Sequence, residues 1–333
     1  MRILWSVLLL LVLLPSYSGE ERLTLWPATF AIRTERVELD WREPARKQLG
    51  ELTFLGGVRL TSPVHGFGSF SVMSVDRDRF TLLSDGGNFV RFRLNRDWRV
   101  SDVSSGALVQ GPGTGWRKLD RDSESLAHDP ATGSYWVGFE WHNQIWRYDS
   151  QFRNGHGVRP AAMTRWTRSG GPETMVRLRD GSFVVLAESA WTRPSRARQG
   201  LWFAGDPIRA RREGFRFVYH RPPGFAPTDA AELPDWRIVV LHRRASLKDG
   251  FTAVLTIVER GSIRPGAIVK GREIARFAAP VVHDNCEGLA VTQEGRDTIL
   301  WIASDDNQLF FQRSLLLKFR LNQSPERRTA RTP

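Results

Sequence analysis

Three glutamates stand at the start of short apolar runs and are the first residues in this sequence that could do chemistry. They are Glu124, Glu173 and Glu287, and each leads through a turn with acidic residues into a stronger apolar run. Carboxylates that are brought together repel one another and resist removal from water unless a cation compensates them. Clusters of oxygen ligands suit calcium better than zinc. The pattern therefore predicts a calcium site if the fold gathers the three glutamates.

A second acidic series follows the stronger apolar runs. Its members are Asp85, Glu140, Glu188 and Asp305 with Asp306. They could add oxygens near the same site, and we select Asp305 as a fourth metal ligand. The alternative is that both series cap turns or accept hydrogen bonds from nearby backbone amides, as acids do without any metal.

The elements that must position these acids are β-strands. Short runs of Val, Phe, Trp, Ile and Leu, bounded by Gly, Asp, Asn or Pro, recur along the chain, whereas helical spacing of apolar residues is scarce. Five copies of one template begin near residues 71, 124, 173, 228 and 287. Their separation of roughly 50 to 60 residues suits a four-stranded propeller blade with its loops. Because the first strand of each blade lines a central channel, the repeated glutamates would form a ring.

The predicted fold class is therefore all-β, and the predicted architecture is a β-propeller. We favour six blades and keep five and seven as alternatives. The sixth blade would be completed by the strand-like residues 23–39, which could pair with C-terminal strands. A pair of β-sandwiches is the competing architecture, and the long repeat period disfavours it.

Composition and charge limit the classes of function. The 333 residues include 13 Trp and 19 Phe, and 41% are hydrophobic, which is typical of a globular chain. The formal net charge is +12, but the arginines are scattered and form no basic stripe, so we expect no nucleic-acid partner. The single cysteine, Cys286, is expected to pack in the core rather than act as a nucleophile. The usual serine-hydrolase, nucleotide and zinc motifs are absent from the sequence.

The two ends of the chain differ from its middle. Residues 1–18 have the pattern of a signal peptide, with Arg2, an apolar run over residues 3–14 and then Pro15. That run is shorter than the roughly 20 residues that span a bilayer. We expect a propeller domain over residues 19–322 and a basic, disordered tail over residues 323–333. The mature protein is predicted to be periplasmic or secreted, monomeric, and not inserted in a membrane.

The chain resembles the phytase-like family of bacterial exported proteins, which is described by an esterase-like activity of phytase. The resemblance extends over roughly residues 50–322. Its motifs are residues 122–126, 171–175, 180–181, 227–231, 285–290, 304–307 and 312–317.

The resemblance implies a propeller that hydrolyses phosphate or carboxylate esters, with a small anionic ester as substrate. In that interpretation the three glutamates are catalytic and hold calcium, and Arg243 and Arg313 bind the substrate. The fourth copy departs from the template, because Thr228 stands in place of Glu and Arg243 in place of the second acid. A substrate anion could enter on that side.

Two other functions fit the same sequence. One is a non-catalytic periplasmic propeller that binds a sugar, a peptide or an envelope component at the channel mouth, with structural acids. The other is a scaffold that docks partner proteins through Trp-rich loops, which would need a large exposed aromatic patch.

Overall fold

The computed structural model describes residues 24–168, 170–188, 197–209 and 214–322. The predicted signal peptide and the predicted C-terminal tail lie outside the described residues. The regular elements of the described chain are strands and three short 3-10 turns, so the all-β prediction is confirmed. No helix in the described residues is long and apolar enough to cross a membrane.

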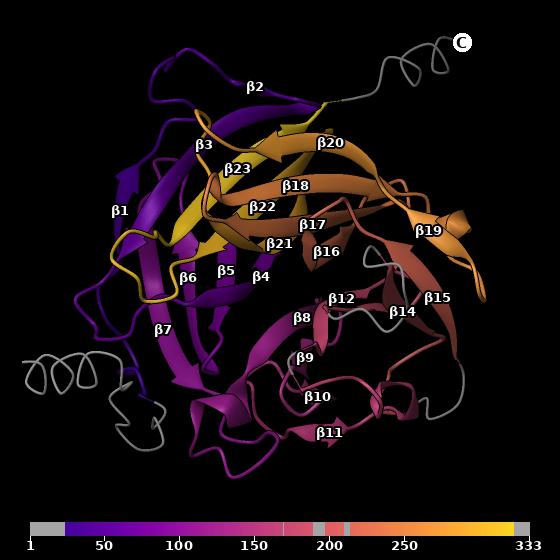
Figure 1. Cartoon of the computed structure of the whole chain (residues 1–333). Helices are drawn as coiled ribbons and strands as arrows, with labels where there is room; N and C mark the ends of the chain where they lie inside the picture. The colour runs from indigo at the N-terminus through magenta and orange to yellow at the C-terminus, as the bar shows by residue number, and fades with distance from the viewer. Residues whose placement is uncertain (1–23, 169, 189–196, 210–213, 323–333) are drawn as a thin grey trace, which may run out of the picture.

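Five sheets surround a common axis and form the blades of a propeller (Figure 1). Blade 1 contains β4 (Phe70–Asp76), β5 (Arg79–Ser84), β6 (Asn88–Leu94) and β7 (Val100–Ala107). Blade 2 contains β8 (Ser123–Asp129), β9 (Ser134–Phe139), β10 (Gln144–Tyr148) and β11 (His156–Val158). Blade 3 contains β12 (Pro172–Arg177), β13 (Phe183–Ala187), β14 (Ala197–Phe203) and β15 (Gly214–His220), and β19 (Ile268–Lys270) adds a parallel edge.

The last two blades hold the rest of the strands. Blade 4 contains β16 (Ala226–Glu232), β17 (Ile238–Ser246), β18 (Gly250–Val258) and β20 (Arg272–Phe277). Blade 5 contains β21 (Asn285–Glu294), β22 (Asp297–Asp305), β23 (Leu315–Leu321), β3 (Leu52–Thr61) and β1 (Arg33–Arg36), and β2 (Gln48–Leu49) pairs with β3.

The favoured count of six blades is corrected to five, which was one of the two alternatives. The five predicted copies supply the five inner strands, and these strands contact one another in the order β4, β8, β12, β16, β21 and back to β4. The C-terminal copy contributes only three strands to its blade. The N-terminal strand β3 completes that blade by pairing with β23, from Leu52 opposite Leu321 to Arg59 opposite Leu315. The first and last strands of the described residues therefore close the ring inside blade 5, and residues 24–322, apart from the gaps named above, form five blades.

The core lies between neighbouring blades, because alternate residues of each strand point to opposite faces of its sheet. Between blades 5 and 1, for example, Trp301 packs edge-on against Phe80 with ring centroids 4.8 Å apart. Full burial of a large apolar side chain contributes about 1.5–3 kcal/mol. Such interfaces hold the inner strands at fixed positions around the channel.

Candidate functional site

Each inner strand carries a β-bulge at the same place. The register shifts between Phe70 and Val72, Ser123 and Ser125, Pro172 and Thr174, Pro227 and Asp229, and Cys286 and Gly288. A bulge adds one residue to a strand and changes the direction of its side chain. The fold thus places one extra residue per blade at the start of the channel. These residues are Ser71, Glu124, Glu173, Thr228 and Glu287.

The two hydroxyl residues at the bulges tie neighbouring blades together. Ser71 Oγ donates a hydrogen bond to the carbonyl of Ser123 at 2.6 Å, and Thr228 Oγ1 donates to the carbonyl of Cys286 at 3.3 Å. Both acceptors directly precede a bulged glutamate in the next blade. The hydroxyls therefore support the strands that carry glutamates and add no charge of their own.

The second acidic series also occupies equivalent positions in the blades. Each member belongs to the second strand of its blade or directly follows it, one residue beyond the position opposite the start of the bulge. The amide of Glu140 donates to the carbonyl of Asp122 at 2.9 Å, and the amide of Glu188 donates to the carbonyl of Gly171 at 3.2 Å. Asp85 bonds in the same way to Ser69. In blades 5 and 4 the corresponding residues are Asp305, opposite Asn285, and Arg243, opposite Ala226. Blades 1, 2, 3 and 5 have an acid at this position, whereas blade 4 has an arginine.

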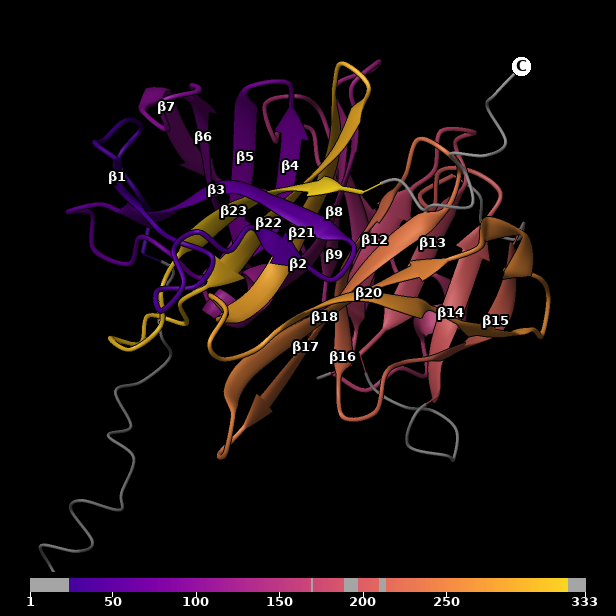
Figure 2. The ribbon, with the colours of Figure 1, turned by 90° about the horizontal axis from the view of Figure 1, so that it is seen from above.

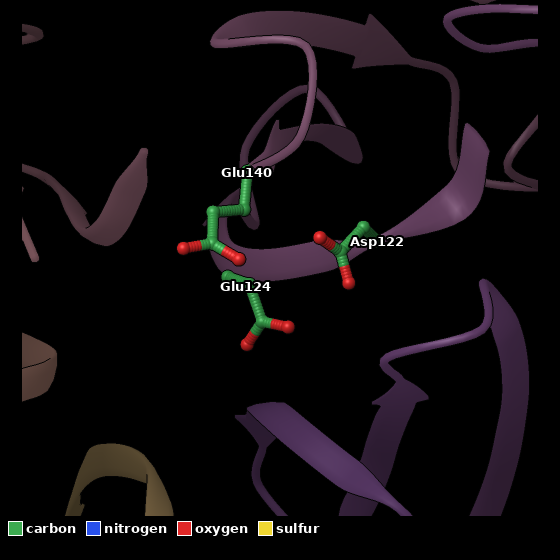
Figure 3. A group of neighbouring side chains, drawn as sticks. All are labelled: Asp122, Glu124 and Glu140. Atoms are coloured by element: carbon green, nitrogen blue, oxygen red, sulfur yellow. The ribbon is translucent and has the colours of Figure 1, made fainter. Parts of the chain in front are cut away.

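The acids of blades 2 and 3 converge into two groups that share one residue. Asp122, Glu124 and Glu140 each offer an oxygen within 4.8 Å of the others, and so do Glu140, Glu173 and Glu188. Figure 3 shows the first group, with the three side chains close together on blade 2. We call these five residues the carboxylate cluster. Both groups offer carboxylate oxygens only, and either group could hold a metal ion.

Burial raises the pKa of four carboxyls of the cluster. The pKa of Asp122 rises to about 6 and that of Glu140 to about 8, because burial penalises the ionised form and nearby carboxylates add repulsion. The pKa values of Glu124 and Glu173 are raised well above the usual range for the same reasons. Asp122 and Glu140 also share a hydrogen bond. Without a cation, the cluster therefore holds protons at neutral pH.

Glu287 reaches the channel but pairs with a different partner. Its Oε1 lies 3.1 Å from Arg243 Nε and accepts a hydrogen bond from Asn285 Nδ2 at 2.7 Å. Burial raises the pKa of Glu287 to about 7, although Arg243 and Asn285 favour its ionised form. Arg243 also lies 4.0 Å from Glu188, so its guanidinium links Glu287 to the carboxylate cluster.

The two remaining predicted site residues lie on blade 5 and its loops. Asp305 accepts a hydrogen bond from the amide of Asn307 at 2.7 Å, and burial raises its pKa to about 9, with repulsion from Glu287 adding to the shift. The structure places Arg313 against Asp284, with Nε 3.2 Å from the carboxylate and a second nitrogen donating to the carbonyl of His283.

Sequence reasoning missed three contributors to this site. Asp122 belonged to a family-like motif, but nothing in its spacing marked it as a ligand. Arg198 and Arg221 lie near Glu188, and burial lowers the pKa of Arg198 to about 10, with repulsion from Arg221 adding to the effect. Burial also lowers the pKa of Arg221, and the nearby Glu188 carboxylate counteracts the lowering in both arginines. The site is therefore acidic on blades 2 and 3 and basic where blade 3 meets blade 4.

Cys286 directly precedes a bulged glutamate, yet its thiol is buried. Burial raises its pKa to about 12, so the thiol stays protonated at neutral pH. The structure gives it the surroundings of a packing residue.

Comparison with known proteins gives one family. The model of a family described as "Phytase-like: Esterase-like activity of phytase" matches residues 62–308. No curated protein matches the chain significantly.

Many solved structures are similar to the chain at low sequence identity. The Malassezia sympodialis allergen Mala s 1 is 12% identical, with 86% of this chain and 92% of that chain covered and a TM-score of 0.43. The Cps50 (Swd1) β-propeller domain from Myceliophteria thermophila is 12% identical, with 74% and 71% covered and a TM-score of 0.38. Hydrazine synthase from Kuenenia stuttgartiensis is 11% identical, with 75% of this chain covered and a TM-score of 0.37. The chain spans 61% of the hydrazine synthase chain that it matches.

Proposed function

The chain belongs to the phytase-like family, and from this premise we propose that it hydrolyses phosphate or carboxylate esters at the carboxylate cluster. The observation that carries the proposal is the convergence of five buried or half-buried acids beside Arg243. Guanidinium groups bind phosphate and carboxylate through paired, charge-assisted hydrogen bonds. A small anionic ester held by Arg243 would present its reacting atom to the cluster.

The proton transfers are assigned to Asp122 and Glu140. Their pKa values, about 6 and about 8, lie on either side of neutral pH, where general acid–base catalysis works best. At pH 7 Asp122 is ionised and takes a proton from the attacking water, whose oxygen bonds to phosphorus or to the acyl carbon. Glu140 is protonated and gives its proton to the departing ester oxygen as that bond breaks. Arg243 stabilises the negative charge that develops on the reacting group.

The cluster also fits a divalent cation that prefers oxygen ligands, such as calcium. All of its donors are carboxylates, they are partly or fully buried, and each raises the energy of its ionised neighbours. Asp122, Glu124, Glu140, Glu173 and Glu188 would hold the ion, and the proton transfers by Asp122 and Glu140 belong to the cluster without it. A bound cation supplies neutralisation of ester oxygens and a lowered pKa for a coordinated water.

We further propose that the protein is exported. The sequence of residues 1–18 supports this, and the mature chain would then work in the periplasm or outside the cell as a monomer.

The test is an assay on p-nitrophenyl phosphate, phytate and a short-chain p-nitrophenyl ester, with calcium or with a chelator. Glu173→Gln removes one cluster member, and Glu273→Gln is the matched control, because Glu273 is an exposed residue of β20 paired with Arg276. We expect turnover that Glu173→Gln reduces, because the variant removes a would-be ligand of the cation, and that the control retains. Folded protein that turns over none of the substrates would contradict the proposal and favour a binding propeller.

A further inference from the structure

The β17–β18 hairpin extends past the rest of blade 4 at the end of the propeller that carries the carboxylate cluster (Figure 2). The inner strand β16 pairs with β17 only as far as Ala226 opposite Arg243, whereas β17 continues to Ser246 in its pairing with β18. Arg243 therefore lies at the base of the projecting part of the hairpin. A ligand held by Arg243 would lie beside this projection.

One face of the projecting hairpin carries apolar side chains. Alternate residues of a strand lie on the same face, so Ala245 follows Arg243 on its side of β17. Phe251 pairs with Ala245 across the hairpin and shares this face. The face is turned toward blade 5, because Arg243 Nε lies 3.1 Å from Oε1 of Glu287 on β21. Apolar side chains thus continue outward along the hairpin from Arg243.

A cavity of about 650 Å³ lies between this hairpin and the β22–β23 loop of blade 5. Leu247 and Phe251 line it on the side of the hairpin, and Phe311 and Arg313 line it on the side of the loop. Sites for small molecules typically measure about 300–1,000 Å³, so the cavity has the size of a ligand site.

The apolar side chains of the cavity are accessible to a ligand. Phe311 is 61% exposed, and Leu247 is fully exposed. Phe310 packs edge-on against Phe311, with ring centroids 5.3 Å apart, and is 97% exposed, so it enlarges the apolar wall. Exposed apolar side chains that gather beside a binding site mark a surface that an apolar group covers.

Two partly exposed arginines accompany the apolar walls. Arg313 lines the cavity, and 39% of its side chain is exposed although its Nε lies 3.2 Å from Asp284. Ala245 also lines the cavity, and two residues of a strand span about 7 Å, so the cavity begins about that far along the backbone from Arg243. The Arg243 side chain is 28% exposed. Cationic groups beside apolar ones complement a ligand that carries an anionic group on an apolar chain.

We propose that this cavity holds the apolar chain of the substrate while Arg243 holds its anionic group, so that the substrate is a phosphate ester of a long-chain alcohol. The chain removes its own methylenes and the side chains of Leu247 and Phe311 from water. A compact polyanion such as phytate has no apolar chain and would leave both walls in water. This inference rests on the proposed function, because it names the class of ester that the same site takes.

Calorimetry on the mature chain tests the proposal by comparing octylphosphonate, below the concentration at which it forms micelles, with ethylphosphonate. Both carry the anion on a carbon–phosphorus bond and contain no ester to hydrolyse. Each methylene that leaves water strengthens binding about fourfold, so burial of three of the six additional methylenes predicts a Kd about 60-fold lower for octylphosphonate.

Phe311→Ser and Leu247→Ser each remove one apolar wall of the cavity at an exposed position. Each variant should reduce the preference for octylphosphonate at least about 5-fold and leave the Kd of ethylphosphonate unchanged. Ile268→Ser is the matched control, because Ile268 is 61% exposed and lies on β19 at the edge of blade 3. The control should keep the full preference.

Two results would overturn the apolar site. One is octylphosphonate that binds no more tightly than ethylphosphonate, or does not bind at all, to correctly folded protein. The other is a preference for octylphosphonate that both wall variants retain, which would place the chain elsewhere. Because phosphonate binding needs no turnover, these results are distinct from a failure of ester hydrolysis. Protein that binds octylphosphonate as expected but hydrolyses none of the assay substrates would contradict the proposed function and leave the apolar site in place.

Discussion

Blades 2 and 4 have the same backbone geometry at the channel mouth but carry side chains of different charge there. Both have the bulge, yet blade 2 fills it with Glu124 and blade 4 with Thr228. At the equivalent position of the second strand, blade 2 has Glu140, whose amide bonds to the carbonyl of Asp122, and blade 4 has Arg243, opposite Ala226. The fold therefore sets the positions, and the residue types set the charge. Because blade 4 alone has an arginine where the other blades have an acid, the channel mouth is cationic on the side of blade 4.

Buried carboxyls in the two blades also differ in their partners. In blade 4 Asp229 follows the bulge and accepts the backbone amides of Leu289 at 2.7 Å and Ala230 at 2.8 Å. In blade 2 the strongest neighbours of Glu124 after burial itself are other carboxylates, first of all Glu173. Asp229 thus joins blade 4 to blade 5, whereas Glu124 is held in a repulsive group. Burial alone does not make an acid functional.

The largest effect is expected from Glu140→Gln, which removes the residue shared by both groups of acids. The amide cannot deliver a proton to the departing ester oxygen, so we expect kcat to fall at least about 100-fold. Steady-state kinetics on p-nitrophenyl phosphate measures the change, with Glu273→Gln as the matched control. A variant with normal kcat would show that the cluster on blade 2 is as structural as the acid of blade 4.

Arg243→Gln removes the cation that distinguishes blade 4 and should have the next largest effect. Hydrogen bonds to charged groups contribute about 1.5–3 kcal/mol, so KM for an anionic phosphate ester should rise about 10- to 100-fold. A neutral carboxylate ester should lose less in KM. The control is Arg276→Gln on β20, where Arg276 pairs with Glu273. Equal losses on both substrates would mean that Arg243 only orders Glu287.

These features were predictable from the sequence to different degrees. The repeat placed all five inner strands, because blade spacing and alternation are local properties of the chain. The blade count was not predictable in the same way, since β3 pairs with β23 from the far end of the sequence. The partners of Glu287 depend on how blades 4 and 5 pack, and the spacing of the glutamates contains no such information. Glu140 and Glu188 were visible as a series, but their convergence required the fold.

The free energy of unfolding should depend on pH when no cation is bound, and a bound cation should remove this dependence. The pKa values of Asp122, Glu140, Glu287 and Asp305 are raised to between about 6 and about 9 in the folded chain. Their contribution to stability is therefore complete below the ordinary carboxyl pKa and is lost as pH rises through the folded values. In chelator we expect Tm to fall by several degrees from pH 5 to pH 9. Calcium at 100 times its Kd would restore about 2.7 kcal/mol. A flat profile in thermal melts would show that the acids are already compensated.

The smallest effect compares matched amide substitutions in the two blades. Asp229→Asn replaces an oxygen that accepts the Leu289 amide, and an amide nitrogen cannot accept it, so stability should fall by on the order of 1 kcal/mol with kcat unchanged. Glu124→Gln removes a carboxyl from a repulsive group, so in chelator at pH 8 stability should rise instead. Thermal and urea melts measure both signs. If both variants lose stability, the carboxyls of blades 2 and 4 have the same structural role, and the contrast between the blades reduces to Arg243.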